Sequence, residues 1–201
     1  TLPPFCRFAL VEAENPSGAQ EAGIAPDSFR LLEYLHDAGQ ASAEKSRLVY
    51  LATSGTTGKP KIVVFPHDTL LGNARNCLDR LQLNAMDRII IPVPLAHMYG
   101  LGAALLPAVQ AGASIHLVPE ANLVNYLQAE AEFEPTVAFL TPSFGHLLLK
   151  GRKRERPYRL TVLAGDRAGE RTFAEYEQRH GCTVNLYGST ELGVIAAGDP
   201  Q

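Results

Sequence analysis

The stretch from Leu48 to Lys61 reads LVYLATSGTTGKPK, and the expected fold of the chain follows from it. Leu48 to Ala52 is a short apolar run of β-favouring residues, which predicts a buried strand. Thr53 to Lys61 then brings four hydroxyl groups, two lysines and two glycines into one loop. Backbone N–H groups in such a turn form a concave anion site, and the hydroxyl and ammonium groups add further donors. This combination predicts a loop that binds polyphosphate.

The loop does not follow the Walker A pattern, in which a glycine is followed by four residues and then by Gly-Lys-Ser/Thr. Gly55 and Gly58 are only three positions apart, and Lys59 precedes Pro60, so no hydroxyl group follows the lysine to bind magnesium. The spacing therefore disfavours a P-loop NTPase. A loop rich in Ser, Thr and Gly is also typical of a flexible linker, but the preceding strand and the two lysines favour phosphate binding.

Two further motifs lie downstream of this loop. Pro94 to Gly100 reads PLAHMYG, and Tyr187 to Glu191 reads YGSTE. Together with Thr53 to Lys61, which fits the pattern TSGTTGxPK at every position, they resemble the motifs of the adenylate-forming superfamily and follow the same order. This superfamily includes acyl-CoA and aryl-CoA synthetases, luciferases and the adenylation domains of non-ribosomal peptide synthetases. The resemblance covers roughly residues 47–197, most of the chain.

The resemblance implies a definite reaction. A carboxylate attacks the α-phosphorus of ATP, which gives an acyl-adenylate and releases pyrophosphate. The acyl group then passes to the thiol of CoA or of a phosphopantetheine arm on an acyl-carrier protein. Catalysis consists of aligning two anions and stabilising the charge that develops on the phosphoryl oxygens. ATP, Mg²⁺ and a small carboxylic acid are the implied ligands.

The resemblance also assigns roles to individual residues. The residues implied to bind the β- and γ-phosphates and the departing pyrophosphate are Thr53, Ser54, Gly55, Thr56, Thr57, Gly58, Lys59 and Lys61. The implied catalytic residues are Lys61, Thr190, which donates to the α-phosphate, and Glu191, which holds Mg²⁺. The ring of Tyr187, next to Gly188, stacks on adenine. The plainer interpretation of an isolated YGSTE is a turn with a solvated carboxylate.

Two other positions have a functional and a structural interpretation. Gly165 and Asp166 fall where the family has a Gly-Gly turn along adenine, although Ala164 replaces the first glycine; the alternative is a strand-to-helix loop in which Asp166 is the N-cap. His97 and Gly100 fall in the motif of the acyl pocket. His97 either faces the carboxylate substrate or is a structural histidine, and both interpretations stay open.

Along the chain, short apolar runs alternate with segments of helical spacing. Residues 1–20 are expected to be irregular or an edge strand. Strands are predicted over 61–65, 88–93, 114–118, 136–141, 159–164 and 182–186, and helices over 28–38, 68–83, 99–110, 122–131, 142–150 and 170–180. Because the strands are continuously apolar, the pattern predicts an α/β fold with a mostly parallel sheet flanked by helices. The loops after Ala52 and Leu186 are expected at the carboxyl ends of its strands, where ligands bind.

Composition excludes several other classes. The chain has 201 residues, a net charge of −3, 46% hydrophobic and 19% charged residues, as an ordinary globular protein has. The charge argues against a nucleic-acid partner. No apolar run is long enough to span a membrane, and no secretory signal is found. The three cysteines, Cys6, Cys77 and Cys182, are odd in number and far apart, which favours reduced thiols in a cytoplasmic protein.

The expected domain organisation follows from the resemblance. Residues 1–46 are interpreted as an N-terminal segment of the large domain, and residues 47–201 as its AMP-binding core. Family members continue with an aspartate that contacts ribose, a hinge and a small C-terminal domain, so the chain is interpreted as a fragment or a shortened homologue. A non-catalytic nucleotide- or acid-binding homologue is the alternative function. The enzyme hypothesis requires that one ATP can reach both Thr57 and Glu191.

Overall fold

The computed structural model describes residues 48–53, 61–152 and 157–200 with their side chains, and the backbone of residues 8–12, 19–23 and 29–34. The chain divides into two compact units, Thr1–Ser46 and Arg47–Gln201, and each is described by itself. All of the candidate site residues belong to the second unit. Ser54 to Lys59, six of the residues implied to bind phosphate, lie outside the described residues.

The described residues of the first unit form a three-stranded antiparallel sheet. Its strands β1 (Phe8–Glu12), β2 (Ala19–Gly23) and β3 (Phe29–Tyr34) pair in the order β1-β3-β2. The helix predicted over 28–38 is therefore wrong, because residues 29–34 form the central strand and pair on both sides. The apolar residues there fit helical spacing, but pairing with strands distant in sequence decides the structure. Of the two alternatives for residues 1–20, Phe8–Glu12 adopts the edge strand.

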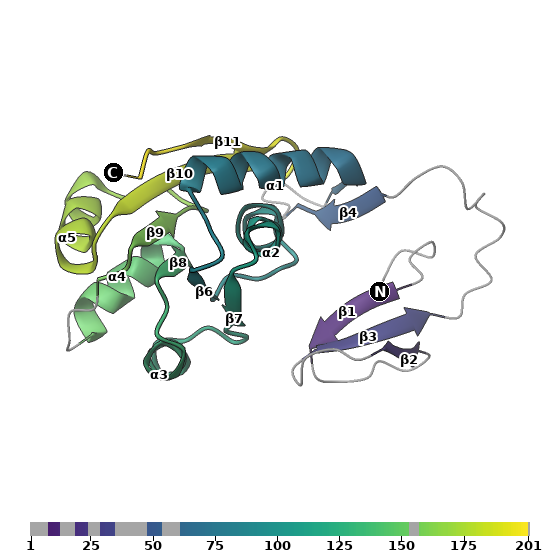
Figure 1. Ribbon diagram of the computed structural model, residues 1–201, viewed down its shortest axis with the longest axis horizontal. Helices are drawn as coiled ribbons and strands as arrows, with labels where there is room; N and C mark the ends of the chain where they lie inside the picture. The colour runs from purple at the N-terminus through teal and green to yellow at the C-terminus, as the bar shows by residue number, and fades with distance from the viewer. Residues whose placement is uncertain are drawn as a thin grey trace. The chain divides into compact units, whose positions relative to one another are not determined.

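The second unit is built on a six-stranded sheet, seen edge-on to the left in Figure 1. Its order is β11-β10-β9-β8-β6-β7. Neighbouring strands are parallel except for the antiparallel pair β10–β11. The strands are β6 (Arg88–Ile91), β7 (Ser114–Leu117), β8 (Val137–Leu140), β9 (Leu160–Leu163), β10 (Thr183–Ser189) and β11 (Gly193–Ala197). Every residue of the central strands β8 and β9 is buried, so the predicted mostly parallel sheet is confirmed.

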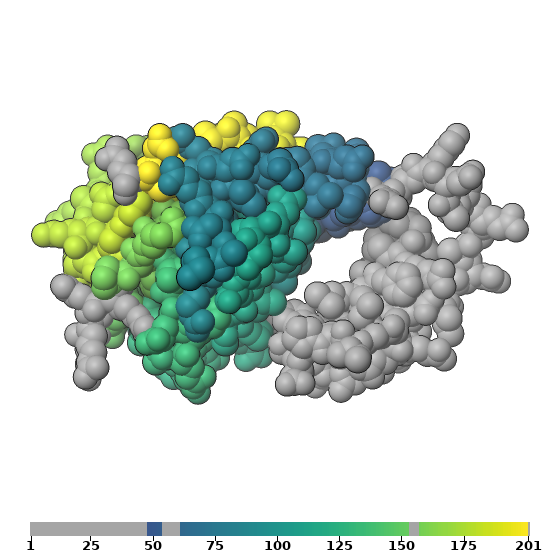
Figure 2. Space-filling model, viewed as in Figure 1, coloured from purple at the N-terminus to yellow at the C-terminus, as the bar shows by residue number. Residues whose placement is uncertain are grey.

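Helices cover both faces of this sheet (Figure 1). On one face lie α1 (His67–Leu81), the π-helix η1 (Tyr99–Leu105) and α2 (Leu106–Ala111); on the other lie α3 (Leu123–Phe133), α4 (Pro142–Gly151) and α5 (Glu170–His180). Ile89 and Ile91 pack under the first group, whereas Ile90 packs under the second. This alternation along one strand produces two hydrophobic layers. Helix α1 lies at the surface along β11 (Figure 2).

The strand that precedes the hydroxyl-rich loop is not part of the parallel sheet. Instead β4 (Leu48–Ala52) pairs with β5 (Ile62–Pro66) as an antiparallel hairpin that forms a sheet of its own. The expectation of a buried parallel strand is therefore wrong, since only Leu51 of β4 is fully buried. The connection between the two strands is too short for a parallel crossover, so it permits only an antiparallel pair.

Two predicted helix starts have different outcomes. Asn122 caps α3, because its side-chain oxygen accepts from the N–H of Asn125 at 2.9 Å. Asp68 does not cap α1, which begins at His67 after Pro66 and has no side-chain cap. Asp68 instead lies in the first turn, where a carboxylate interacts favourably with the helix dipole.

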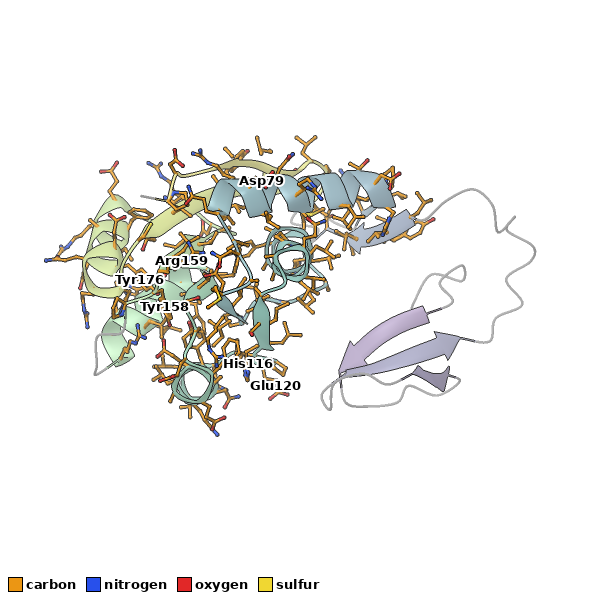
Figure 3. The ribbon with its side chains drawn as sticks, in the orientation of Figure 1. Asp79, His116, Glu120, Tyr158, Arg159 and Tyr176 are labelled. Atoms are coloured by element: carbon orange, nitrogen blue, oxygen red, sulfur yellow. The ribbon has the colours of Figure 1, made fainter. Side chains whose placement is uncertain are left out.

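A buried polar cluster joins the helices α3, α4 and α5. Arg152 forms an ion pair with Glu130, and its Nη1 atom lies 2.8 Å from Nδ1 of His180. The hydroxyl groups of Tyr126 and Tyr158 are 2.8 Å apart, and Tyr158 lies in the layer near α4 in Figure 3. Burial, and then the charge of Arg152, lower the pKa of His180 to about 4. The histidine is therefore neutral at pH 7 and accepts a hydrogen bond from Arg152.

The described residues offer neither a membrane span nor a cluster of metal ligands. None of the helices there combines the length and apolarity that crossing a bilayer requires. The same part of the chain contains no group of three or more His, Cys, Asp or Glu side chains arranged to hold a metal ion. Cys77 is buried and Cys182 is half-buried, and both are free thiols. Burial raises the pKa of Cys77 to about 12, so this thiol is unreactive at neutral pH.

Candidate active site

Two adjoining pockets open where the parallel strands end. The first, called here the inner pocket, has a volume of about 450 Å³. Its lining comes from the segments that follow β6, β8 and β9 and from η1, β10 and β11. The lining residues are Val93, Pro94, His97, Met98, Tyr99, Gly100, Thr141, Ala164, Gly165, Leu186, Gly188, Ser189, Thr190, Gly193 and Val194.

The second, called here the outer pocket, has a volume of about 770 Å³. Its lining residues are Gly165, Asp166, Arg167, Ala168, Asn185, Leu186, Tyr187, Gly188, Ala196, Ala197 and Gly198. Gly165, Leu186 and Gly188 line both pockets, so the two pockets are neighbours. The carboxyl ends of parallel strands are the usual position of ligands in open α/β sheets.

The sequence-predicted residues divide between the two pockets. His97, Gly100 and Thr190 line the inner pocket, whereas Asp166 and Tyr187 line the outer one. Gly165 and Gly188 form part of the shared wall. Residues from three separate motifs therefore meet at two adjoining pockets, which the spacing of the motifs in the sequence does not by itself require.

The YGSTE motif is mainly strand, not loop. β10 continues through Tyr187 to Ser189 before the chain turns at residues 190–192, although the sequence predicts that it stops at Leu186. A bulge between Tyr187 and Gly188 leaves the tyrosine 68% exposed beside the outer pocket. A Cβ atom on Gly188 would lie only 2.5 Å from the carbonyl oxygen of Gly193. Glycine is needed here because β10 and β11 approach each other so closely.

The turn at residues 190–192 is held by local hydrogen bonds and a glycine. The N–H of Leu192 donates to Oγ of Ser189 at 3.1 Å, which fixes the turn from within. Gly193 ends it with a φ of 72°, a left-handed conformation that favours glycine. Thr190 faces the inner pocket, whereas Glu191 is exposed on the turn and does not line either pocket.

Asp166 does not act as an N-cap. Its Oδ1 atom accepts from the N–H of Arg167 at 2.7 Å, and α5 begins after Gly169 without a side-chain cap. The structural alternative is therefore wrong in its N-cap, although the residues between β9 and α5 do form a strand-to-helix loop. Gly165, with a φ of 94°, turns the chain so that residues 165–168 form a wall of the outer pocket.

The PLAHMYG motif forms the start of η1. The N–H of His97 donates to the carbonyl of Pro94 at 3.3 Å, and the imidazole group is exposed at the inner pocket. Gly100 packs directly on that loop, since a Cβ atom there would lie 2.2 Å from the carbonyl oxygen of Pro94. Only glycine allows η1 to approach the loop so closely.

Tyr99 and Asn185 are pocket residues to which the sequence analysis assigned no role. The hydroxyl group of Tyr99 lies 2.8 Å from the carbonyl oxygen of Val162 and 3.1 Å from that of Leu140, at the ends of β9 and β8. Burial raises the pKa of Tyr99 well above 10, so the hydroxyl stays protonated and can donate. Asn185 lines the outer pocket next to Tyr187. Both residues lie inside or beside the motifs, which was the only available signal.

The base of the hydroxyl-rich loop is ordered by the hairpin. The N–H of Thr53 donates to the carbonyl of Lys61 at 2.9 Å, and the N–H of Lys61 donates to Oγ1 of Thr53 at 3.1 Å. The hairpin packs through Leu51 and Phe65 into a cluster that also holds Met98, a residue of the inner pocket. Thr57 lies outside the described residues, so its distance from Glu191 stays untested.

The donors present fit magnesium bound together with a nucleotide. Thr190 offers a hydroxyl group in the lining of the inner pocket, and the next residue, Glu191, offers an exposed carboxylate. Mg²⁺ usually takes one or two carboxylates, several waters and the phosphate oxygens of a substrate, and does not need a cage of protein ligands. A single exposed carboxylate is therefore sufficient on the protein side.

Comparison with known proteins gives consistent results. The profile of the AMP-binding enzyme family matches residues 9–201. Indoleacetate–CoA ligase of Aromatoleum aromaticum is 35% identical over 155 residues, which cover 75% of this chain and 30% of the relative. 4-Coumarate–CoA ligase 2 of Oryza sativa subsp. japonica is 34% identical over 108 residues, which cover 52% of this chain and 19% of the relative.

Solved structures show the same similarity. ATP-bound MatB from Rhodopseudomonas palustris matches with a TM-score of 0.67 and 26% identity, over 75% of this chain and 30% of that one. O-succinylbenzoate coenzyme A synthetase from Bacillus subtilis, in complex with ATP and magnesium ion, matches with a TM-score of 0.67 and 27% identity, over 75% of this chain and 32% of that one. This chain therefore spans about 30% of the length of several relatives.

Proposed function

The chain belongs to the family of AMP-binding enzymes, and from this premise we propose that it forms the nucleotide- and acid-binding core of a ligase. The proposed reaction activates a carboxylic acid with ATP to an acyl-adenylate and then forms a thioester. The observation that carries the proposal is that the two pockets adjoin and share Gly165, Leu186 and Gly188 in their linings. It places Tyr187 beside one hollow and Thr190 and His97 beside the next, as a nucleotide joined to an acyl group requires.

The outer pocket suits adenosine. The exposed ring of Tyr187 offers a flat apolar surface for stacking, and the amide of Asn185 offers both a donor and an acceptor for a base edge. The backbone of residues 165–166 forms the opposite part of the lining. Adenine held there would direct the α-phosphate towards the shared wall at Gly188, next to the inner pocket.

The chemistry follows from that placement. An oxygen of the substrate carboxylate attacks the α-phosphorus, the bond to the bridging oxygen of pyrophosphate breaks, and the mixed anhydride forms. Thr190 would donate to the α-phosphate, and Glu191 would hold Mg²⁺, whose charge stabilises the phosphoryl oxygens. Lys61 and the hydroxyl-rich loop would bind pyrophosphate as it leaves. His97, exposed at the inner pocket, would face the carboxylate of the acid.

The inner pocket favours an acid with an apolar body. Its described lining includes Val93, Met98, Leu186 and Val194 and contains neither lysine nor arginine. A second carboxylate on the substrate would have no cation there to offset its desolvation. Monocarboxylic acids should therefore be preferred to dicarboxylic acids of similar size. The proposed acceptor of the acyl group is the thiol of CoA or of a carrier arm.

The test is ATP–pyrophosphate exchange by the complete gene product with a panel of benzoate, phenylacetate, hexanoate and succinate. We expect exchange that depends on an added monocarboxylate. Lys61→Ala and Glu191→Ala should each lower the exchange rate by roughly 100-fold, by the loss of electrostatic stabilisation. Glu191→Ala should also raise the Mg²⁺ concentration at half-maximal rate. Lys150→Ala and Glu132→Ala, exposed on α4 and α3, are the matched controls and should exchange normally.

Other outcomes would identify the rival functions. ATP binding without exchange for any acid would favour a non-catalytic nucleotide-binding homologue. ATP hydrolysis without added acid would favour an NTPase. Unchanged kinetics in both site variants would refute the roles given to Lys61 and Glu191.

A further inference from the structure

One side chain outside all of the motifs connects two walls of the inner pocket. Asn73 lies on α1, and its Nδ2 donates to the carbonyl of Gly102 on η1 at 2.9 Å. Its Oδ1 accepts from the N–H of Val194 on β11 at 2.8 Å. The partners are 29 and 121 positions away in the sequence. The amide therefore links three elements that are separate in the chain.

The backbone around this amide is shaped to admit it. A Cβ atom on Gly193 would lie 2.6 Å from Oδ1 of Asn73, and a Cβ atom on Gly102 would lie 3.3 Å from Nδ2. The Cβ atom on Gly102 would also lie 2.3 Å from Sδ of Met98. Glycines on both partner elements thus leave the space that the amide occupies. Such close fit means that the position of Asn73 and the positions of η1 and β11 depend on each other.

The two partners carry the residues that face the substrate. Val194 lines the inner pocket and follows directly after the turn that holds Thr190 and Glu191. Gly102 belongs to η1, whose first residues, Tyr99 and Gly100, also line this pocket. The two hydrogen bonds of Asn73 therefore fix the position of β11 relative to η1.

We propose that Asn73 is a positioning residue that holds the turn at residues 190–192 against η1, and so sets the place of Thr190 and Glu191 relative to the acid. This inference rests on the proposed function, since it concerns the same pocket. Asn73 does not line either pocket, and it acts through Val194 and Gly102.

The chemistry of the side chain is specific to an amide. The site needs one donor and one acceptor, at a fixed separation, from the same side chain. Aspartate would keep the acceptor for Val194 but present a carboxylate oxygen to the carbonyl of Gly102. Leucine has nearly the same shape and would supply neither group, leaving both backbone groups without their partner. Comparison of these two variants separates the hydrogen bonds from packing.

The kinetic test uses the complete gene product and the monocarboxylate of the panel that gives the fastest exchange. For Asn73→Leu we expect kcat/KM for the acid to fall roughly 10- to 100-fold, because a displacement of about 1 Å in a reacting geometry costs this much. The KM for ATP should stay within about twofold, since the outer pocket is held by other contacts. For Asn73→Asp, kcat/KM for the acid should lie between the values of wild type and Asn73→Leu. Asn76→Leu, exposed on the same helix, is the control and should match wild type.

The split between the two KM values distinguishes positioning from general damage. A partly unfolded enzyme would lose active molecules, which lowers kcat and leaves both KM values unchanged. That result, or normal kinetics in Asn73→Leu, would overturn the proposal.

A second measurement does not require activity. Hydrogen–deuterium exchange of the peptide covering residues 189–197 should be roughly tenfold faster in Asn73→Leu than in wild type, and unchanged in Asn76→Leu, because the amide of Val194 loses its acceptor. If wild type shows no pyrophosphate exchange with any acid, the proposed function fails, and this measurement alone decides whether Asn73 orders the turn. Equal exchange in Asn73→Leu and wild type would refute the role of Asn73 in either case.

Discussion

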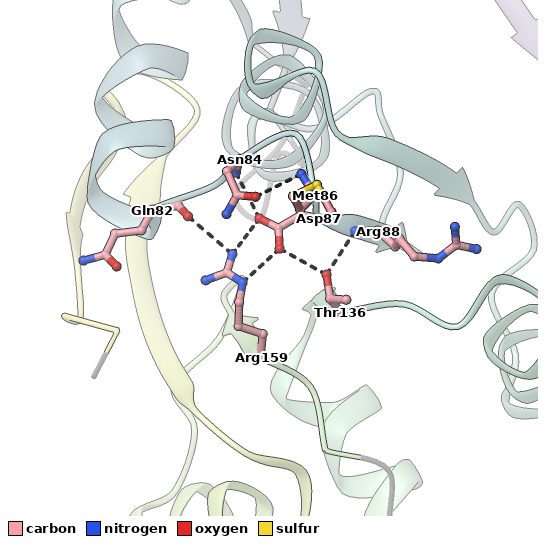
Figure 4. Close-up of polar contacts among 7 residues, drawn as sticks. All are labelled: Gln82, Asn84, Met86, Asp87, Arg88, Thr136 and Arg159. Atoms are coloured by element: carbon pink, nitrogen blue, oxygen red, sulfur yellow. Dashed lines mark hydrogen bonds and ion pairs between the residues drawn. The ribbon is translucent and has the colours of Figure 1, made fainter.

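Replacement of Asp87 by asparagine tests how the amino-terminal ends of the parallel strands are held together. Asp87 is only 3% exposed and precedes β6. Its carboxylate accepts from Nε and Nη2 of Arg159 at 2.9 and 2.7 Å, from the N–H of Asn84 at 3.0 Å and from Oγ1 of Thr136 at 3.1 Å (Figure 4). Thr136 precedes β8 and Arg159 precedes β9. One carboxylate therefore connects the amino-terminal ends of three neighbouring strands.

The expected loss of stability follows from these contacts. Breaking a buried ion pair typically costs about 3–5 kcal/mol, mainly because the remaining charge is left without a partner. The side chain of Arg159 is 37% exposed, so water recovers part of that cost. Asparagine keeps the shape and one acceptor but turns an NH₂ group towards donors. We therefore expect the free energy of unfolding to fall by about 2–4 kcal/mol for Asp87→Asn.

Urea denaturation followed by circular dichroism measures this change. Asp79→Asn is the control, because Asp79 is an exposed aspartate on α1 (Figure 3) and should change stability by less than about 0.5 kcal/mol. A double-mutant cycle with Arg159→Met should return a coupling energy of at least about 1 kcal/mol. A loss below about 1 kcal/mol for Asp87→Asn, or no coupling to Arg159, would show that the cluster does not hold the strands together.

Two further predictions concern the helix layers. The pKa of His180 is lowered from 6.5 to about 4, so as the pH falls the imidazole is protonated in the unfolded chain before it is protonated in the folded one. The free energy of unfolding should therefore be unaffected by this group above pH 6.5. It should fall by up to roughly 3 kcal/mol as the pH drops from 6.5 to 4. His180→Asn keeps an acceptor for Arg152 but has no group that titrates in this range. Acid titration followed by near-UV circular dichroism should therefore show a smaller loss of stability between pH 6.5 and 4 in the variant. Identical pH dependence of the two proteins would contradict the role given to His180. Gly100→Ala should destabilise the protein by roughly 1–3 kcal/mol and raise the KM for the acid, because its Cβ meets the carbonyl of Pro94 at 2.2 Å. Gly72 lies on α1 with open space around it, so Gly72→Ala should stabilise the protein by up to about 1 kcal/mol in thermal melts. If Gly100→Ala and Gly72→Ala change stability equally, the packing argument is refuted.

Features of the fold that depend on near neighbours could be predicted from the sequence. Asn122 caps α3 through a residue three positions away, and Gly181 directly follows the last residue of α5, as glycine commonly does at a helix end. Residues 29–34 and 48–52 are the places where the local pattern misleads. Both are apolar segments whose structure depends on the strands with which they pair, and that information lies elsewhere in the chain.

In the candidate site too, some residues are recognisable from the local sequence and others only from the folded chain. The motifs name Tyr187, Thr190 and Gly100 because each motif is a short local sequence. Asn73 carries no such signal, since an asparagine on an amphipathic helix is usually a solvated residue. Its importance arises from partners on two other elements, which only the folded chain brings together. Residues of this kind are missed whenever a site is inferred from motifs alone.

The glycines at the pockets have a different role from the glycines of a flexible loop. At Gly100, Gly188 and Gly193 an added Cβ atom would lie 2.2–2.6 Å from an atom of a neighbouring segment. These residues are needed because the backbone segments are packed against one another, so they mark rigidity at the rim of the site. The geometry of Thr190 therefore depends on the contact of β10 and β11 with α1 and η1. A YGSTE motif placed in a chain without the matching glycines and without Asn73 would keep its side chains but not their positions relative to the acid.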